Sequence, residues 1–173
     1  AFKLIELNKK YKFIKNHSRL LDIGSCPGGW AQVTSKIIKS GKILTIDLEK
    51  MEEVKNVTFL QCNFLDAGVE DEIMNYFGEK LDVILSDMAA DTTGNKSLDC
   101  IRTNQLCSEV IDFSSKNLKP KGVLVSKLFM GEDFLEVKDL AKSRFKKVQF
   151  FKPEASRDES KETYLYCSTL KTL

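Results

Sequence analysis

The chain has 173 residues, of which 42% are hydrophobic and 30% charged, which predicts one globular domain over residues 1–173 with a substantial core. The formal net charge is only +2, which excludes the strongly basic composition of many nucleic-acid-binding proteins. The cysteine count of 5 is odd, no C-x-x-C pair occurs, and His17 is the only histidine. This pattern disfavours disulfides and excludes a histidine-rich metal site, so we expect reduced thiols and no metal.

Local charge and hydropathy add further expectations. No apolar stretch is long enough to span a membrane and no signal-peptide core is visible, so we expect a cytoplasmic protein that does not bind membranes. The chain starts at Ala1, which is typical of a fragment, and no amphipathic stripe suggests a partner surface, so we expect a monomer. Two basic clusters, which are usually solvated surface but can bind phosphates, are Lys9, Lys10, Lys12 and Lys15, and Lys142, Arg144, Lys146 and Lys147.

Short apolar runs alternate with helical segments along the chain. In chain order we expect a strand at 19–24, a helix at 30–40, strands at 42–48 and 57–63, a helix at 69–77, a strand at 81–87, a helix at 101–118, a strand at 123–129, a helix at 133–145, and strands at 147–152 and 163–170. This alternation predicts an α/β fold with a mostly parallel sheet and helices on both faces. The last two strands are joined by the polar stretch PEASRDESKE without a helix, which predicts an antiparallel last strand.

Polar groups follow the predicted parallel strands. In open α/β sheets, ligands bind beyond the carboxyl ends of the strands. The groups found there are Gly24 at the start of the loop GSCPGGW, then Asp47, Asn63 and Asp87, with Lys127 inside the fifth apolar run. One charged residue at a strand end is usually solvated, but five such strands in succession predict a binding crevice.

The glycine-rich loop indicates what this crevice binds. It lacks the dinucleotide pattern G-x-G-x-x-G, and the chain contains no P-loop. Asp47 follows Gly24 at the spacing of about 20 residues that is typical of an acid binding a ribose diol. The sequence therefore predicts a ribonucleoside ligand without a pyrophosphate.

The remaining crevice residues narrow the ligand further. Asn63 has both a donor and an acceptor for an adenine edge, and Gly28 and Gly29 allow the backbone to approach a ligand closely. These features favour S-adenosylmethionine, with its positive sulfonium beside Asp87. Trp30 is equally consistent with a cofactor contact and with a core aromatic that packs a helix on the sheet.

Seven stretches carry a resemblance to a known family. The chain resembles the FtsJ-type ribose 2′-O-methyltransferases, the heat-shock ribosomal RNA methyltransferases, over essentially its full length. The stretches, in order, are AFKLIEL, LLDIGSCPGGWAQV, IDLEKM, FLQCNF, LSDMA, VSKLFMGE and KPEASRDESKETYLY. The resemblance implies a Rossmann-like methyltransferase fold, with a seven-stranded sheet whose last strand is antiparallel.

The resemblance also implies site residues. The family's catalytic Lys-Asp-Lys-Glu tetrad falls on Lys3, Asp87, Lys127 and Glu162. The implied S-adenosylmethionine contacts, together with the glycines of the loop, are Gly24, Gly28, Gly29, Trp30, Asp47, Asn63 and Asp87.

Two roles are open for Lys127. Methyl transfer to a hydroxyl is an in-line displacement that depends on alignment of the reacting atoms. A neutral Lys127 would act as the general base, whereas a charged Lys127 would steer the oxygen and stabilise the developing alkoxide. Lys3 and the sulfonium favour the neutral form, and the two acids of the tetrad favour the charged form. An edge-strand lysine is the plain alternative, but the run around Lys127 is too apolar for an edge.

Three features depart from the family pattern. Asn63 stands where the bacterial ribosomal enzymes carry aspartate, so we expect weaker cofactor binding from the lost charge. Ala90 and Asp91 replace a Pro-Asn pair near the reacting centre, which leaves substrate placement open. The family's basic residues upstream of Lys3 lie outside this sequence, so Lys3 is expected to be loosely held.

The resemblance to short bacterial members implies a uridine of 23S ribosomal RNA, in the large ribosomal subunit, as the methyl acceptor. A transfer RNA 2′-O-methyltransferase of the same family is an alternative. A non-catalytic RNA-binding ribosome assembly factor is another, which the complete tetrad disfavours. An NAD-dependent dehydrogenase is disfavoured by the loop spacing.

Overall fold

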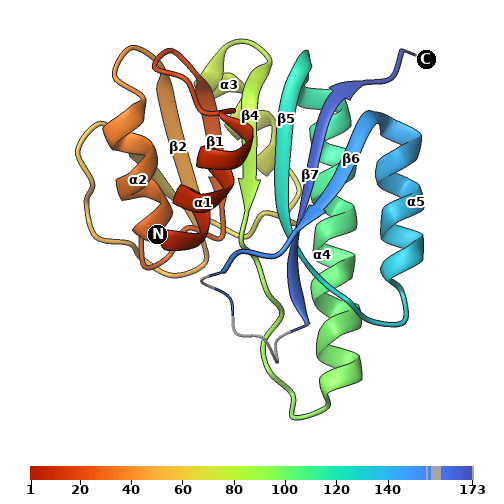
Figure 1. Ribbon diagram of the computed structural model, residues 1–173. Helices are drawn as coiled ribbons and strands as arrows, with labels where there is room; N and C mark the ends of the chain where they lie inside the picture. The colour runs from red at the N-terminus through yellow and green to blue at the C-terminus, as the bar shows by residue number, and fades with distance from the viewer. Residues whose placement is uncertain (155, 157–160, 173) are drawn as a thin grey trace.

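The computed structural model describes residues 1–154, 156 and 161–172. Within them the strands are β1 (Arg19–Ile23), β2 (Lys42–Asp47), β3 (Thr58–Gln61), β4 (Leu81–Ser86), β5 (Leu118–Phe129), β6 (Phe145–Phe151) and β7 (Glu162–Leu170). The helices are α1 (Phe2–Tyr11), α2 (Gly29–Ile37), α3 (Val69–Phe77), α4 (Lys96–Asn117) and α5 (Phe134–Arg144) (Figure 1).

The described strands form one 7-stranded sheet in the order β3-β2-β1-β4-β5-β7-β6. Strands β1 to β5 run parallel to one another, and β7 runs antiparallel to both β5 and β6. The predicted α/β fold with an antiparallel last strand is therefore confirmed. The order reverses between β1 and β4, and such a switch point opens a crevice at the carboxyl ends of the strands.

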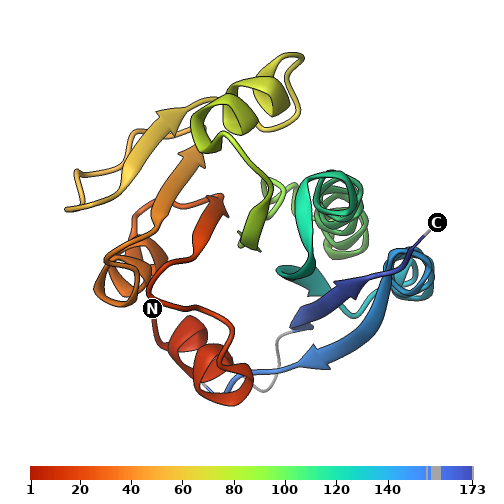
Figure 2. The same ribbon diagram turned by 90° about the horizontal axis from the view of Figure 1, so that it is seen from above.

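Both faces of the sheet are buried, and the side chains of each strand alternate between the two faces. On β1, Leu20 packs with Leu4 and Leu7 of α1, whereas Leu21 packs with residues of the other face. Figure 2 shows the sheet from above, with α1 and α2 on one side and α4 and α5 on the other. Continuous burial on two faces explains why the strands read as apolar runs rather than alternating ones.

Helix α1 is the main element that the sequence reading missed, since no element was expected before residue 19. Only Leu4 and Leu7 are buried in it, and lysines and asparagine interrupt the apolar period. Helix α4 also begins earlier than expected, because the Asn95 side chain caps it by accepting a hydrogen bond of 3.1 Å from the Leu98 N–H. In the described residues, no helix combines the length and apolar character needed to cross a membrane.

Candidate functional site

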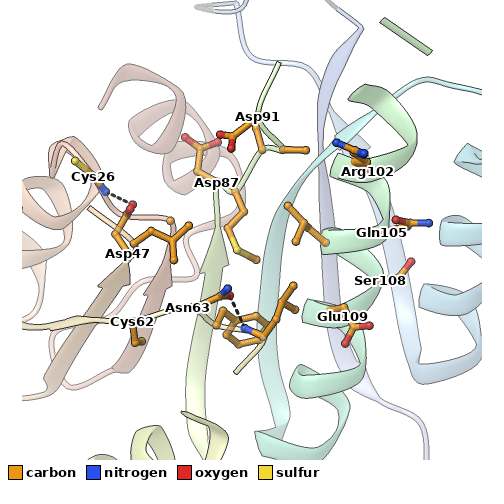
Figure 3. Close-up of a pocket in the computed structure, with 18 residues that line it drawn as sticks. Cys26, Asp47, Cys62, Asn63, Asp87, Asp91, Arg102, Gln105, Ser108 and Glu109 are labelled. Carbon is orange, nitrogen blue, oxygen red and sulfur yellow. Dashed lines mark hydrogen bonds between the residues drawn. The ribbon is translucent and has the colours of Figure 1, made fainter. Parts of the chain in front are cut away.

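Two adjoining cavities lie at the carboxyl edge of the parallel strands. The larger, about 790 Å³, is bounded by the ends of β1 to β4 on one side and by α4 on the other (Figure 3). The smaller, about 320 Å³, lies beside the first residues of α1. Both are lined by Gly24, Cys26 and Asp87. The two cavities therefore meet at Asp87, and the larger has the size of a typical small-molecule site.

The glycine loop is shaped by close backbone contacts. Gly24 has φ +75°, and a Cβ there would lie 2.9 Å from Met88 Cγ and 3.1 Å from the Met88 backbone nitrogen. Gly28 has φ +116°, and its Cβ would lie 3.2 Å from Met51 Sδ. Side chains rarely adopt such φ values, so both positions require glycine. The glycines thus bring the loop against the walls of the crevice.

Asp47 holds the glycine loop from the end of β2. Its Oδ2 accepts a hydrogen bond of 2.8 Å from the Cys26 N–H, which Figure 3 shows. Its Oδ1 accepts one of 2.9 Å from the Glu49 N–H. Because each carboxylate oxygen can accept a second hydrogen bond, Asp47 can fix the loop and still bind a diol.

Asn63 lines the crevice beyond the end of β3, and its amide is held by the following backbone. Its Oδ1 accepts a hydrogen bond of 2.9 Å from the Leu65 N–H (Figure 3). This bond sets the amide orientation and leaves Nδ2 and the second lone pair of Oδ1 for a ring nitrogen and the amino group of adenine. Two apolar side chains that line the same cavity, Leu48 and Leu65, are 66% and 52% exposed. Exposed leucines beside an amide offer the contacts that a flat nucleobase needs.

Four charged side chains far apart in the sequence converge beside the smaller cavity. Lys3 Nζ lies 2.5 Å from Glu162 Oε1, and Lys127 Nζ lies 3.4 Å from Glu162 Oε2. Lys127 Nζ also lies 3.2 Å from Asp87 Oδ1. They come from α1, the segment after β4, β5 and the first residue of β7. The order Lys3, Glu162, Lys127, Asp87 is a continuous chain of alternating charge, which we call the tetrad chain.

Burial makes the two central members of the tetrad chain the most protected. The Lys127 and Glu162 side chains are 13% and 12% exposed, against 32% for Lys3 and 29% for Asp87. Burial by itself raises the pKa of Glu162, but the hydrogen bond from Lys3 and the charges of both lysines outweigh it, so the pKa lies below its usual value. Glu162 is therefore a carboxylate that holds both lysines.

Tyr164 connects the two acids of the tetrad chain. It is fully buried, and its hydroxyl lies 2.7 Å from Asp87 Oδ1 and 3.3 Å from Glu162 Oε1. Burial and the adjacent carboxylates raise the pKa of Tyr164, so the hydroxyl remains a donor. Sequence reasoning did not single out this residue. The signal was its period-two spacing from Glu162 on one strand, which places both side chains on one face.

The other predicted residues are distributed between the cavities. Gly29 and Trp30 line the smaller one, while Gly28 lines neither and packs on Met51. Trp30 is only 6% exposed and its ring centre lies 5.8 Å from that of Tyr164, so it is both a core aromatic and a wall of the cavity.

Some wall residues of the larger cavity were not predicted as site residues, namely Cys26, Cys62, Asp91, Arg102, Gln105 and Glu109. Four of these lie on α4 or in the segment before it, and their positions depended on how that helix packs. Family resemblance had placed Asp91 near the reacting centre, but no signal in the sequence placed the three α4 residues, Arg102, Gln105 and Glu109, at the crevice.

The arrangement suits an elongated nucleoside with a cationic centre. A ribose would bind at Asp47 and a base at Asn63, and a positive centre would lie near the Asp87 carboxylate where the two cavities meet. An acceptor hydroxyl entering the smaller cavity would meet Lys3 and Asp87, which line it, with Lys127 paired to the Asp87 carboxylate. Within the part of the chain that is described, no group of three His, Cys, Asp or Glu side chains is arranged to hold a metal ion.

Comparisons with known proteins agree with this chemistry. A family model described as FtsJ-like methyltransferase matches residues 1–170. The chain is 43% identical over 171 residues to ribosomal RNA large subunit methyltransferase E of Pelagibacter ubique, covering 99% of this chain and 84% of that protein.

Two solved structures are similar as well. A protein assigned as a ribosomal RNA methyltransferase from Plasmodium falciparum has a TM-score of 0.86 at 30% identity, covering 98% of this chain and 95% of that one. Human methyltransferase-like protein 13, solved in complex with SAH, has a TM-score of 0.69 at 15% identity, covering 98% and 82%, and so shares the fold.

Proposed function

The chain belongs to the FtsJ-like methyltransferase family, and from this premise we propose that it transfers a methyl group from S-adenosylmethionine to a ribose 2′-hydroxyl of large-subunit ribosomal RNA. The relative from Pelagibacter ubique supports the substrate class by its name. The observation that carries the proposal is the tetrad chain beside two adjoining cavities. We propose a uridine of 23S ribosomal RNA as the acceptor.

The methyl donor supplies an electrophilic methyl group on a positively charged sulfur. Asp47 would hold its ribose, and the Asn63 amide would hold its adenine between the exposed leucines. The glycine loop would bind its amino-acid end, because the smaller cavity is lined by Gly24, Cys26, Gly29 and Trp30. The Asp87 carboxylate would attract the sulfonium without contributing a covalent bond.

Lys127 would position the acceptor hydroxyl. Lys127 forms ion pairs with Asp87 and Glu162. These pairs favour the role in which a charged Lys127 steers the oxygen over the role of general base. Lys127 Nζ would then donate to the ribose oxygen and direct a lone pair at the methyl carbon. As the C–O bond forms, the C–S bond breaks and its electron pair stays on sulfur. The hydroxyl proton leaves to Asp87 Oδ2, which accepts no hydrogen bond from the described residues.

Lys3 would act at a distance from the reacting atoms. Its ammonium pairs with Glu162, which would otherwise draw Lys127 fully toward itself. Tyr164 similarly would hold Asp87 in place through its hydrogen bond. Both would act by positioning other members of the tetrad chain.

The proposal is tested by mapping 2′-O-methyl groups after incubation with S-adenosylmethionine carrying a labelled methyl group. Three substrates are compared: large ribosomal subunits lacking the modification, free 23S ribosomal RNA, and transfer RNA. We expect label at one uridine ribose of the large subunit. Label on transfer RNA alone would show that transfer RNA, and not ribosomal RNA, is the substrate. The absence of label on every RNA would reject the proposed reaction.

We further propose that residues 1–173 act as one domain, as a monomer and in the cytoplasm, where ribosomes assemble. Support for one domain comes from the single sheet that joins both core clusters.

We propose that no metal takes part in methyl transfer, because a neutral thioether leaves without help from a Lewis acid. Methyl transfer unchanged by a chelator, and a monomeric mass by light scattering, are the expected results.

A further inference from the structure

Five lysines gather near the amino edge of the sheet, opposite the tetrad chain. We call Lys10, Lys12, Lys15, Lys121 and Lys147 the amino-edge lysines. Lys12, Lys15 and Lys121 line a cavity of about 410 Å³ together with Tyr11 and Tyr166. Lys147 lies over both tyrosine rings, and Lys10 lies over the ring of Tyr11. They come from α1, the segment after it, β5 and β6, so the sequence alone could not group them.

Aromatic rings hold two of these lysines in place. The rings of Tyr11 and Tyr166 are stacked, 3.8 Å apart. Lys147 Nζ lies 5.8 and 5.6 Å from their centres, and Lys10 Nζ lies 4.9 Å from the Phe151 ring. A ring attracts an ammonium through its quadrupole and orders it without neutralising its charge. Tyr166 is only 6% exposed, so these rings support lysines and offer little face to a nucleobase.

The charge of the amino-edge lysines is not balanced. Within residues 1–154, 156 and 161–172, none of the five forms an ion pair, whereas Lys116 and Lys119 each pair with an acid. Asp82 is the one acid among the described residues lining this cavity, and it already pairs with Lys119. Five ammonium groups without ion-pair partners among the described residues, two of them ordered by aromatic rings, are suited to binding a polyanion.

The amino-edge lysines lie within reach of an RNA strand bound at the tetrad chain. In Figure 1, α1 rises from the chain's N-terminus toward the edge where the C-terminus lies. From Lys3 to Tyr11 a helix rises about 12 Å. Consecutive phosphates of a nucleic-acid strand are a few ångströms apart, so the lysines begin within a few nucleotides of the reacting ribose. A third cavity, between α4 and α5, is lined by Glu132, Asp133 and Glu136, which would repel RNA.

We propose that the amino-edge lysines bind backbone phosphates of the RNA that flanks the methylated nucleotide, independently of base sequence. This inference rests on the proposed function for the identity of the polyanion. The proposal assigns only part of the second basic cluster of the sequence, residues 142–147, to this RNA-binding surface. Lys147 belongs to the surface, whereas Arg144 turns to the other face and pairs with Asp112 of α4. Lys142 lies on α5, whose buried residues pack on that other face.

The test compares a Lys10→Gln/Lys147→Gln double variant with a matched Lys55→Gln/Lys142→Gln control. Each double variant removes the charges of two exposed lysines and leaves a polar side chain with an aliphatic stem at both positions. Binding of a fluorescent 23S RNA hairpin is measured by anisotropy at several salt concentrations, without methyl donor. We expect the double variant to bind about tenfold more weakly, and the slope of log affinity against log salt to fall by about two. The control should match the wild type.

Equal affinity and slope in the double variant and the control would overturn the proposal. Lys121→Gln provides a second variant from a different element, expected to lower the slope by about one. Unchanged cofactor affinity and melting temperature show that each variant folds. If the double variant lost affinity for phosphatidylserine vesicles but kept its affinity for RNA, the polyanion would be a membrane and the proposal would fail. Wild-type protein that binds RNA through these lysines but methylates none would instead reject only the proposed function.

Discussion

Tyr164 lies directly opposite Lys127 in the β5–β7 pairing, and its hydroxyl donates a 2.7 Å hydrogen bond to Asp87. Lys127 Nζ contacts the same carboxylate oxygen from β5 at 3.2 Å. The antiparallel strand therefore does more than complete the sheet. It delivers both Glu162 and the buried hydroxyl that fixes Asp87 next to the proposed path of the methyl group.

Replacing this hydroxyl should slow methyl transfer. In Tyr164→Phe, Asp87 loses one donor, and a hydrogen bond to a charged group is worth about 1.5–3 kcal/mol. We expect kcat to fall by about 10- to 100-fold with little change in cofactor affinity, measured by steady-state kinetics and calorimetry. Tyr166→Phe, the same substitution two residues along β7, should retain wild-type kcat. Equal rates in the two variants would contradict a positioning role for Tyr164.

Removing the central lysine should have the largest effect. Lys127→Ala deletes the group that would orient the hydroxyl and stabilise charge, and one such group is worth about 10²- to 10³-fold in kcat. Cofactor affinity should change by less than about threefold, because Lys127 does not line the larger cavity. Lys119→Ala, on the same strand but paired with Glu79 and Asp82, is the control. Wild-type transfer by Lys127→Ala would reject the mechanism.

The fold was predictable because its signals are local. Strands buried on both faces read as apolar runs, and the polar, turn-like sequence before residue 163 predicted the antiparallel strand. Helix α1 was not predicted because its only buried residues, Leu4 and Leu7, give a weak apolar periodicity in a segment rich in lysine. The start of α4 escaped because a cap at Asn95 precedes the apolar residues. Boundaries set by caps and by tertiary packing carry little signal in a single sequence.

The candidate site was predictable only in part. Strand-end logic identified Asp47, Asn63, Asp87 and Lys127, because parallel strands deliver their carboxyl ends to one edge. Lys3 and Glu162 came from family resemblance, since no spacing links residues 159 positions apart. Tyr164 escaped because a buried tyrosine in an apolar strand has the pattern of a core residue.

Asp47 should control cofactor binding rather than the transfer step. Asp47→Asn keeps the shape but loses the charge, and its amide nitrogen cannot accept from the Cys26 N–H. We expect cofactor affinity to fall by about 10- to 100-fold, from one lost charged hydrogen bond, with kcat at saturation largely retained. Calorimetry measures the affinity, and Asp82→Asn at the opposite edge is the control. A loss of kcat without a loss of affinity would contradict this role.

Asp22 lies inside the sheet beneath the site. Its side chain on β1 is fully buried, and both carboxylate oxygens have no hydrogen-bond partner among the described residues. Burial, followed by the charges of Asp87 and Asp47, raises the pKa of Asp22 to about 8 from its ordinary 3.8. The folded protein therefore keeps a proton on Asp22 that the unfolded chain has already released at neutral pH.

This buried acid should make stability depend on pH. Between the unfolded pKa of 3.8 and the folded pKa of about 8, the native state binds more protons than the unfolded state, so stability falls as pH rises. Asp22→Asn is neutral throughout, so its melting temperature should decline less across this window, whatever its absolute stability. Asp139→Asn, at an exposed position on α5, should keep the wild-type slope. Thermal unfolding followed by circular dichroism measures the slopes. A wild-type slope in Asp22→Asn would show that Asp22 is already ionised at neutral pH, which would require a partner for its carboxylate that the described residues do not supply.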